Sequence, residues 1–551
     1  NGVLKQVWQN GMMSDNTMRF RYMSHDFMSN ISKRFGDFDL NLLLGATIDE
    51  TKTDRVSMMA YNFTVPDFFS YANAKDTEKR FSHGASKKRL VGLFGEFRAS
   101  WNNMLYLTVS GRNDWTSTLP IENRSYFYPS VSGSFVFTEM LHKLGWMSDS
   151  VLNFGKIRAS WAKVGKDTGA YETATALWPV GAFLNGLVGA GNTWTRGNPY
   201  LKPEMTKSTE IGLELSFFKN RLHIDYAYYT NDSYNQILSP RGPQSTGYIF
   251  CSINAGNVYN KGMELSISGI PVQTKDLTWE VGFNMAGNRG TLDGLPDGMD
   301  VMYVTDVQYA GAQAASFNGG DFMAIAGTEW KRNEDGKLIL DKNGMPTFDS
   351  ALSAVGNREA TFTGGLNNTL TWKGFTFNML WEFRVGGDVI NGTRYAMDNS
   401  GVSRFSGDVR NRPLTVEGVD ANGNAVSHTW EADKTYVFNE VEKSGYNIIK
   451  DYYQNYYPKN TRNYITEVNS LRLRSVSLSY DFPKKWLQRV GFVKRASVSV
   501  AATNLLLFTN YDGDPEVAAA GAGVGGSSSV GFDYCGVPAT SGMSFGLNLT
   551  F

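Results

Sequence analysis

The last eight residues constrain the fold of this chain more than any other stretch. They read Ser544-Phe545-Gly546-Leu547-Asn548-Leu549-Thr550-Phe551, so polar or small residues alternate with apolar ones up to a terminal aromatic. Successive side chains of an extended strand lie on opposite faces, which places the apolar residues together on one face. This pattern is typical of the closing strand of an outer-membrane barrel. We therefore expect lipid against that face, and Ser544, Gly546, Leu549 and Phe551 as the barrel-assembly signal.

Composition agrees with one large β-structure. The chain has 551 residues, of which 13% are aromatic, 57 are glycine and only 19% are charged. These values exclude a disordered chain and a helical solenoid. Lys plus Arg equals Asp plus Glu at 53 each, so the chain carries no basic footprint for nucleic acid.

The way the chain would cross a membrane follows from the length of its apolar runs. No run of 18 or more apolar residues occurs, which excludes a helical span. Barrel strands instead alternate apolar and polar residues over about ten positions. The fold class expected is all-β, a transmembrane antiparallel β-barrel. The opening Asn1-Gly2-Val3-Leu4-Lys5 has no signal-peptide pattern, so we expect a removed signal or a missing start.

The clearest hairpin lies between Val91 and Trp115. Apolar residues alternate with polar ones along 91–101 and 105–115, and Asn102-Asn103 forms a tight turn between them. A second hairpin joins 209–217 to 222–228 through Lys219-Asn220. Further strands are expected at about 26–50, 126–138, 151–165, 255–290, 360–388, 467–482, 495–506 and 542–551. The total is about fifteen, with a sixteenth expected near 16–22, and their length favours a bilayer-crossing barrel over a soluble sandwich.

Connections between these strands alternate in length. Short links include Gly36-Asp37, Asn102-Asn103, Lys219-Asn220 and Lys373-Gly374. Long links are expected at about 51–86, 166–205, 291–359, 389–466 and 507–541. Membrane barrels have short periplasmic turns and long extracellular loops. The long segments are therefore the expected extracellular loops, where specificity would reside.

Six short stretches, in order from 198 to 551, together resemble the SusC/RagA-like TonB-dependent outer-membrane transporters. They are Asn198-Pro199-Tyr200-Leu201-Lys202-Pro203-Glu204, then Asn257-Val258-Tyr259-Asn260-Lys261-Gly262, Thr363-Gly364-Gly365-Leu366-Asn367-Asn368, Leu471-Arg472-Leu473-Arg474-Ser475, Ala502-Thr503-Asn504-Leu505 with Asp514-Pro515-Glu516, and the terminal strand. The stretch 26–165 fits the same family less distinctively. Each motif is weak alone, and their shared order makes the resemblance specific.

The resemblance implies a barrel of about 22 strands with an N-terminal plug in its lumen. The sequence contains no plug-like segment and no TonB-contacting box. We therefore expect residues 1–551 to be a C-terminal barrel portion, with the plug and about seven strands absent or in another chain. The implied partners are a SusD-like lipoprotein lid, TonB acting through a plug outside this chain, outer-membrane lipid and cargo. A dimer of transporter–lid pairs is a further expectation.

Charged residues on the polar strand faces predict a mixed-charge inner wall. They are Glu96, Arg98, Arg112, Glu210, Glu214, Arg221, Asp225 and Glu382. Such a wall suits neutral, hydrated cargo, and structural ion-pair ladders explain it equally well; the ladder interpretation is favoured.

Loop aromatics are the candidate cargo contacts, because sugar rings and peptide side chains stack on flat apolar faces. The candidates are Trp178, Trp194, Trp330, Tyr452, Tyr453, Tyr456 and Tyr457. Loop packing or docking to the lid competes with that role at each position. By resemblance, oligosaccharide is the first expected cargo and oligopeptide the second.

Enzymatic chemistry finds no support in the sequence. There is no His-Glu-x-x-His and no P-loop, so no enzyme activity and no cofactor are expected. Asp341-Lys342-Asn343-Gly344 resembles a calcium loop but lacks the later acidic ligand, which favours a turn and no metal site. Cys251 and Cys535 lie in expected loops, as free thiols or as a disulfide.

The expected function is nutrient import across the outer membrane of a Gram-negative bacterium, driven through TonB. A passive porin or an adhesin would share the strand pattern. An outer-membrane enzyme and a soluble secreted β-protein are further alternatives. Uptake that continues without a proton gradient would favour the passive porin or adhesin. Hydrolysis by the purified protein would favour the enzyme, and extraction without detergent would favour the soluble protein.

Overall fold

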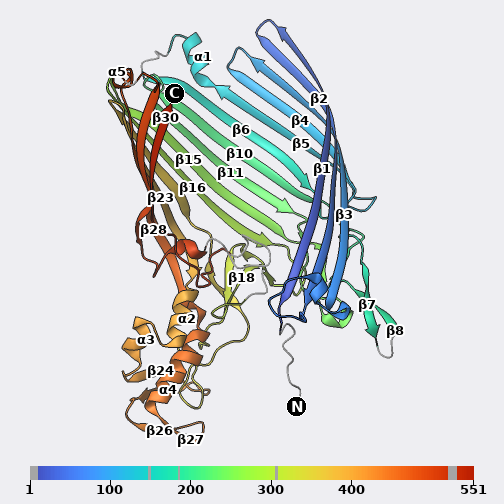
Figure 1. Ribbon diagram of the computed structural model, residues 1–551, viewed down its shortest axis with the longest axis vertical. Helices are drawn as coiled ribbons and strands as arrows, with labels where there is room; N and C mark the ends of the chain where they lie inside the picture. The colour runs from blue at the N-terminus through green and yellow to red at the C-terminus, as the bar shows by residue number, and fades with distance from the viewer. Residues whose placement is uncertain (1–9, 147–150, 184–186, 305–307, 490, 519–529) are drawn as a thin grey trace. The chain divides into compact units, whose positions relative to one another are not determined.

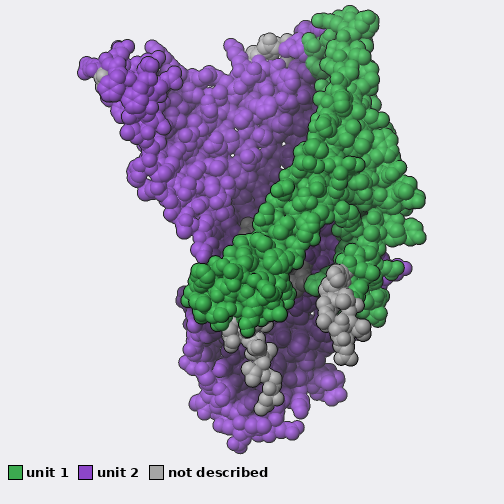
Figure 2. All heavy atoms as spheres, turned by 45° about the vertical axis from the view of Figure 1, so that its right-hand side comes forward, with its two compact units in different colours: residues 1–133, 160–207, 233–255 green, residues 134–159, 208–232, 256–551 purple. Residues whose placement is uncertain are grey.

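The computed structural model describes residues 10–146, 151–183, 187–304, 308–489, 491–518 and 530–551. The chain divides into two compact units (Figure 2): unit 1 holds residues 1–133, 160–207 and 233–255, and unit 2 holds 134–159, 208–232 and 256–551. Four strands have residues in both: β5 (Ser125–Val136), β6 (Leu152–Lys166), β10 (Glu204–Phe217) and β11 (Leu222–Tyr234). Among the described residues, no helix has the length and apolarity to cross a membrane.

Unit 1 is built on four long antiparallel strands. They are β1 (Met12–Phe35), β2 (Phe38–Tyr61), β3 (Lys79–Trp101) and β4 (Leu105–Thr116), paired in that order. Asn102 and Asn103 both have positive φ, +54° and +57°, in the three-residue connection 102–104, where the Met104 N–H donates to the Trp101 carbonyl at 2.9 Å. The register pairs Trp101 with Leu105 and Val91 with Trp115, so the predicted hairpin is confirmed.

The first two strands are longer than predicted. Each has 24 residues, and the separate strand expected near 16–22 is part of β1. The interval between β2 and β3 is 62–78 rather than 51–86. Cross-strand ion pairs hold the polar ends together: Glu50 accepts from Arg89 at 2.7 Å and lies 3.4 Å from Arg21. Such pairs stabilise strand segments that carry little apolar alternation.

The rest of unit 1 consists of short elements. These are β7 (Leu177–Phe183) with β8 (Leu187–Asn192), β9 (Thr195–Arg196) with β13 (Phe250–Cys251), and β12 (Ile237–Leu238) with β14 (Ile253–Asn254). Short 3-10 turns occur at Tyr71–Asn73, Asp76–Glu78 and Gln244–Thr246. Cys251 thus lies in a strand, and both cysteines are free thiols.

Unit 2 contains seven antiparallel strands in chain order. They are β15 (Asn257–Gln273), β16 (Leu277–Asp293), β22 (Phe362–Trp372), β23 (Phe375–Ile390), β28 (Ile465–Asp481), β29 (Arg495–Thr509) and β30 (Gly542–Thr550). Two short helices lie within connections: α1 (Phe137–Lys143) between β5 and β6, and α5 (Lys484–Leu487) between β28 and β29. Over the described residues the long strands total fifteen, as predicted.

Two long connections of unit 2 form structures of their own, although both were expected only as loops. Between β16 and β22, β17 (Val301–Tyr303), β18 (Ala312–Phe317), β20 (Ala324–Gly327) and β21 (Ser353–Asn357) form a small sheet, while β19 (Gly320–Asp321) pairs with β16. Between β23 and β28 lie α2 (Gly392–Ser400), α3 (Arg404–Val409), β24 (Leu414–Val419), β25 (Ala425–Trp430), β26 (Thr435–Phe438), β27 (Val441–Ser444) and α4 (Gly445–Asp451).

We call residues 329–349 and 391–464 together the loop module. Its buried centre comprises Leu340, Met345, Leu414, Val416, Trp430, Phe438, Ile448, Ile449 and Tyr452. In unit 2 the module extends from the ends of β23 and β28, away from the end that carries α5 and the C-terminus (Figure 1). A segment with its own buried core holds its surface residues in fixed positions.

The outward strand faces are apolar and exposed. Phe545 in β30 is 81% exposed, and Leu547 and Leu549 on the same face are also exposed. Leu93 and Phe97 in β3 show the same arrangement in unit 1. Water-soluble proteins rarely expose apolar surface on this scale.

Candidate functional site

Five of the predicted cargo aromatics lie together in the loop module. Trp330 contacts Tyr452 and Tyr457, with ring centroids 6.5 Å and 6.3 Å apart, and its indole Nε1 donates to the Tyr456 carbonyl at 3.0 Å. Tyr452 and Tyr453 meet edge to face at 5.0 Å. Tyr452 is buried, and the others are partly buried against the same core.

Burial of this aromatic cluster also determines its chemistry. It raises the pKa of the Tyr452 and Tyr457 phenols above their ordinary value, because the charged phenolate is poorly solvated there. Both hydroxyls therefore stay protonated at physiological pH. The two rings pack against the core of the loop module and keep a neutral hydroxyl at one edge. The i, i+4 spacing of Tyr452-Tyr453 and Tyr456-Tyr457 brings them onto one side of the helical segment that runs from α4 to Lys459, before the extended Asn460.

The two remaining aromatic candidates belong to unit 1. Trp194 is 69% exposed, and its carbonyl accepts from the backbone N–H groups of Ile249 and Phe250 at 2.9 and 3.0 Å. An exposed indole on a fixed backbone is suited to stacking against a ligand. Trp178 lies in β7, and its side chain falls outside the described part of the structure.

The predicted charged wall consists mostly of ion pairs. Arg158 on β6 bridges Glu210 on β10 and Asp225 on β11, at 3.4 and 2.8 Å. The other pairs are Glu96 with Arg98, Arg112 with Asp114, Glu214 with Lys156, and Glu382 with Arg474. Arg221 was expected on this wall but lies in the turn before β11, because residues 218–220 all have positive φ and form that turn between Phe217 and Leu222. This pairing agrees with the ladder interpretation.

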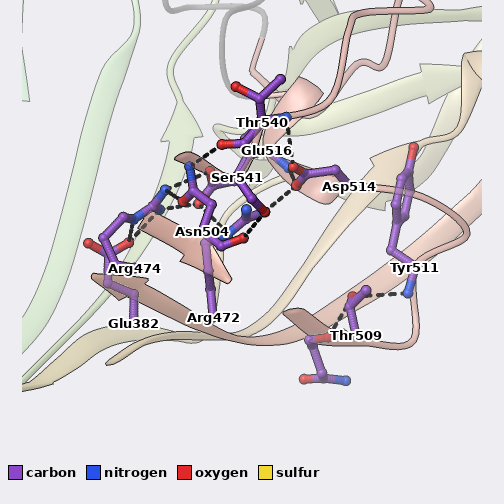
Figure 3. Close-up of polar contacts among 12 residues, drawn as sticks. Glu382, Arg472, Arg474, Asn504, Thr509, Tyr511, Asp514, Glu516, Thr540 and Ser541 are labelled. Carbon is purple, nitrogen blue, oxygen red and sulfur yellow. Dashed lines mark hydrogen bonds and ion pairs between the residues drawn. The ribbon is translucent and has the colours of Figure 1, made fainter. Parts of the chain in front are cut away.

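A polar network ties the 510–541 connection to the sheet of unit 2 (Figure 3). Arg474 on β28 binds both Glu382 on β23 and Glu516, and Arg472 binds Asp514. The Arg472 and Asp514 side chains are almost fully buried. Asp514 also accepts from the backbone N–H groups of Glu516 and Ala539, at 3.0 and 3.2 Å.

Both halves of this network were visible in the sequence as family motifs, but sequence reasoning assigned no contact between them. Arg472 and Arg474 are two residues apart in a strand, and Asp514 and Glu516 are likewise two apart. Equal spacing of opposite charges was the signal that could have paired them. Asn504, which belongs to the same motif as Asp514, has φ +52°, donates to the Thr540 carbonyl at 3.2 Å, and accepts from Arg474 at the same distance.

A cavity of about 500 Å³ lies beside the network. Its lining includes Gly364, Gly365, Glu382, Arg472 and Glu516. At Gly364, a Cβ atom would overlap the Asn284 carbonyl, so glycine is needed for the close approach of β22 to β16. Gly364 and Gly365 of this motif thus line a hollow next to the ion pairs.

The predicted assembly signal lies on the last strand. Ser544, Gly546 and Leu549 are in β30, and Phe551 follows it with its ring stacked 6.0 Å from Phe492. A Cβ at Gly546 would lie 2.5 Å from the Ser499 hydroxyl on β29, so a larger residue there would require that hydroxyl to rotate. The role of these residues in assembly stays a prediction.

No metal centre is found within the described residues. They contain no group of three or more His, Cys, Asp or Glu arranged to hold a metal ion. Asp341 Oδ1 accepts from the backbone N–H groups of Asn343 and Met345 at 2.8 and 2.9 Å, which is the geometry of a turn.

Known proteins resemble this chain over nearly its whole length. TonB-dependent receptor P3 of Formosa agariphila is 26% identical over 565 aligned residues, covering 97% of this chain and 52% of that protein. TonB-dependent receptor SusC of Bacteroides thetaiotaomicron is 25% identical and covers 79% of this chain and 42% of its own length. The chain thus spans about half the length of the curated relatives it matches.

Solved structures share the fold. A structure of the RagAB peptide importer in the closed-closed state superposes with a TM-score of 0.73 at 20% identity, covering 98% of this chain and 56% of that one. A family model for the β-barrel of TonB-dependent receptor-like proteins matches residues 5–505. The chain therefore belongs to the TonB-dependent receptor-like β-barrel family.

Proposed function

We propose that this chain is the barrel part of a TonB-dependent transporter that imports oligosaccharides across the outer membrane of a Gram-negative bacterium. Membership of the receptor family carries the proposal. The paired inner wall supports it, because ion pairs along strands leave a polar surface with little unbalanced charge for hydrated cargo. Membership of a receptor family gives no support to the alternative that the protein is an outer-membrane enzyme.

The proposed partners follow from the relatives. SusC and the RagAB importer motivate a SusD-like surface lipoprotein as the lid over the loop side, and TonB as the source of energy. The loop module and the exposed Trp194 are the candidate surfaces toward cargo and lid. A dimer of transporter–lid pairs is part of the same proposal.

Oligopeptide is the second candidate cargo, since a solved structure with the same fold is named a peptide importer. Cells that carry the gene for this protein, and matched deletion cells, should be given labelled oligosaccharide with unlabelled oligopeptide as competitor. We expect uptake in the first strain only, with no inhibition by peptide. No uptake of labelled oligosaccharide, together with uptake of labelled oligopeptide in a parallel assay, would replace the oligosaccharide assignment.

A pair of tryptophan variants separates cargo contact from packing. Trp194→Ala should weaken oligosaccharide binding about fivefold without changing thermal stability, since its indole is exposed. Trp330→Ala should instead destabilise the loop module by about 3 kcal/mol, because the indole contacts Tyr452 and Tyr457 and binds the Tyr456 carbonyl. Calorimetric titration and thermal unfolding measure the two effects. Unchanged affinity in Trp194→Ala would remove that residue from the cargo contacts.

A further inference from the structure

A pocket of about 260 Å³ opens on the loop module. It lies among three helices, α2, α3, and α4 with the turn that follows it. The end of α2 contributes Asp398, Ser400 and Gly401, and α3 with the residue after it contributes Ser406, Val409 and Arg410. The other lining residues, from α4 and its following turn, are Tyr446, Ile449, Lys450, Tyr453 and Gln454. Its volume fits one unit of an oligomer rather than a whole ligand. The pocket shares none of its lining with the cavity beside the Arg472 network.

Charge in this pocket is unbalanced, unlike charge on the sheet wall. Its charged lining residues are Arg410, Lys450 and Asp398. The Asp398 side chain is only 3% exposed, accepts from the Ser403 hydroxyl at 2.5 Å and lies 3.7 Å from Arg394 Nε. Its carboxyl is therefore shielded from the pocket opening, and the accessible charge of the pocket is positive.

Arg410 is held in place without losing its charge. Its guanidinium donates to the carbonyls of Gly401 and Ser406, at 2.5 and 3.2 Å. Among the described residues no carboxylate forms an ion pair with it, and the same is true of Lys450. The remaining guanidinium N–H groups and the exposed ammonium can donate to an anion, and guanidinium geometry suits a carboxylate.

The other lining groups match a sugar ring. Tyr446 is exposed, Tyr453 and Val409 are partly buried and supply apolar contact surface, and Ile449 is fully buried in the core of the module. Gln454 and Ser400 offer neutral hydrogen-bonding groups for hydroxyls. Aromatic faces with a few polar groups recognise a ring whose faces are apolar and whose rim carries hydroxyls.

We infer that this pocket binds a carboxylate-bearing sugar unit of the oligosaccharide cargo, with Lys450 and Arg410 on the carboxylate and Tyr446 beside the ring. The inference rests on the proposed function and narrows its cargo to acidic oligosaccharides. The cationic side chains of the pocket recognise the carboxylate of the sugar. The ion-paired sheet wall contacts the neutral part of the oligosaccharide through water.

The test uses the protein purified from outer membranes in detergent and calorimetric titration with three probes: trigalacturonate, the neutral galactose trimer and triglutamate. Lys450→Gln should weaken trigalacturonate binding about tenfold, the loss of one charge-assisted hydrogen bond. Lys331→Gln is the matched control, since Lys331 is an exposed lysine of the same module outside the pocket. It should leave all affinities unchanged.

The outcomes separate this inference from the proposed function. If both trimers bind and Lys450→Gln weakens neither, the pocket assignment is wrong and oligosaccharide cargo stands. If triglutamate binds in a Lys450-dependent way and trigalacturonate does not, the ligand is an acidic peptide and the sugar assignment is wrong. If neither trimer binds, both the inference and the oligosaccharide proposal are overturned. Lys450→Glu, which reverses the charge, should abolish trigalacturonate binding while thermal unfolding stays as in the unmodified protein.

Discussion

Asp398 is a buried acid near the end of α2 in the loop module. Burial raises the pKa of its carboxyl, while the Ser403 hydroxyl and the Arg394 guanidinium act in the opposite direction. A raised folded-state pKa means that the neutral form is favoured in the folded module. The stability that this group contributes is fully present below its unfolded pKa of about 3.9 and is lost as pH rises through the higher folded value.

Asp398→Asn should therefore remove a pH dependence. Amides of α2 and α3 in the unmodified protein should show protection that decreases from pH 4 to pH 7 after correction for intrinsic exchange, and this decrease should shrink in the variant. Hydrogen exchange with mass spectrometry measures both. Asp408→Asn, which changes an exposed carboxylate on α3, is the control. An unchanged pH profile in Asp398→Asn would contradict this account of the buried acid.

Asp514 neutralises the buried Arg472 and also accepts from two backbone N–H groups. Removing one partner of a buried ion pair costs about 3 kcal/mol or more. Asp514→Asn should therefore speed exchange of the Glu516 and Ala539 amides by about a hundredfold. Asp512→Asn, an exposed neighbour, should have no effect. Equal exchange in the two variants would show that the network does not hold the 510–541 connection.

At the scale of elements, α4 depends on a close backbone approach. Gly445 begins this helix and donates to the Lys434 carbonyl at 2.7 Å, and a Cβ there would overlap the Glu431 carbonyl. Gly445→Ala should lower the melting temperature of the loop module, because a backbone carbonyl must move. Gly407→Ala on α3 has open space around it and should be neutral or slightly stabilising. Differential scanning calorimetry distinguishes the two; equal melting temperatures would refute the packing argument.

The sheet strands could be predicted from sequence where alternation and turn chemistry coincide. The 91–101 and 105–115 hairpin has both, with two asparagines that tolerate positive φ. The far end of β1 has neither strong alternation nor a turn nearby, so its pairing through ion pairs such as Arg21 with Glu50 could not be read locally. The resulting error was one strand counted as two.

The loop module could not be predicted because its core depends on contacts far apart in sequence. Trp330 meets Tyr452 and Tyr457 across more than a hundred residues. A tryptophan in a loop and a run of tyrosines were identifiable as a set, but their mutual packing was not. The basic pocket was missed for the same reason, since Arg410 and Lys450 lie on different helices and neither forms a motif.

For the whole molecule, the exposed apolar strand faces and the family assignment agree on lipid as the surrounding solvent. The strand faces opposite the lipid carry the paired charges and are therefore polar. Neither feature distinguishes energised import from passive diffusion. Import driven by energy through TonB is therefore the part of the proposed function that most needs a direct test.

Uptake measured with and without energy tests that claim most directly. Cells producing the protein should accumulate labelled oligosaccharide, and accumulation should fall to the level of deletion cells when a protonophore collapses the inner-membrane gradient or when TonB is removed. A passive pore would conduct regardless of both treatments. Loss of uptake in both conditions is the predicted result; uptake that persists in energy-depleted cells would contradict TonB-dependent transport.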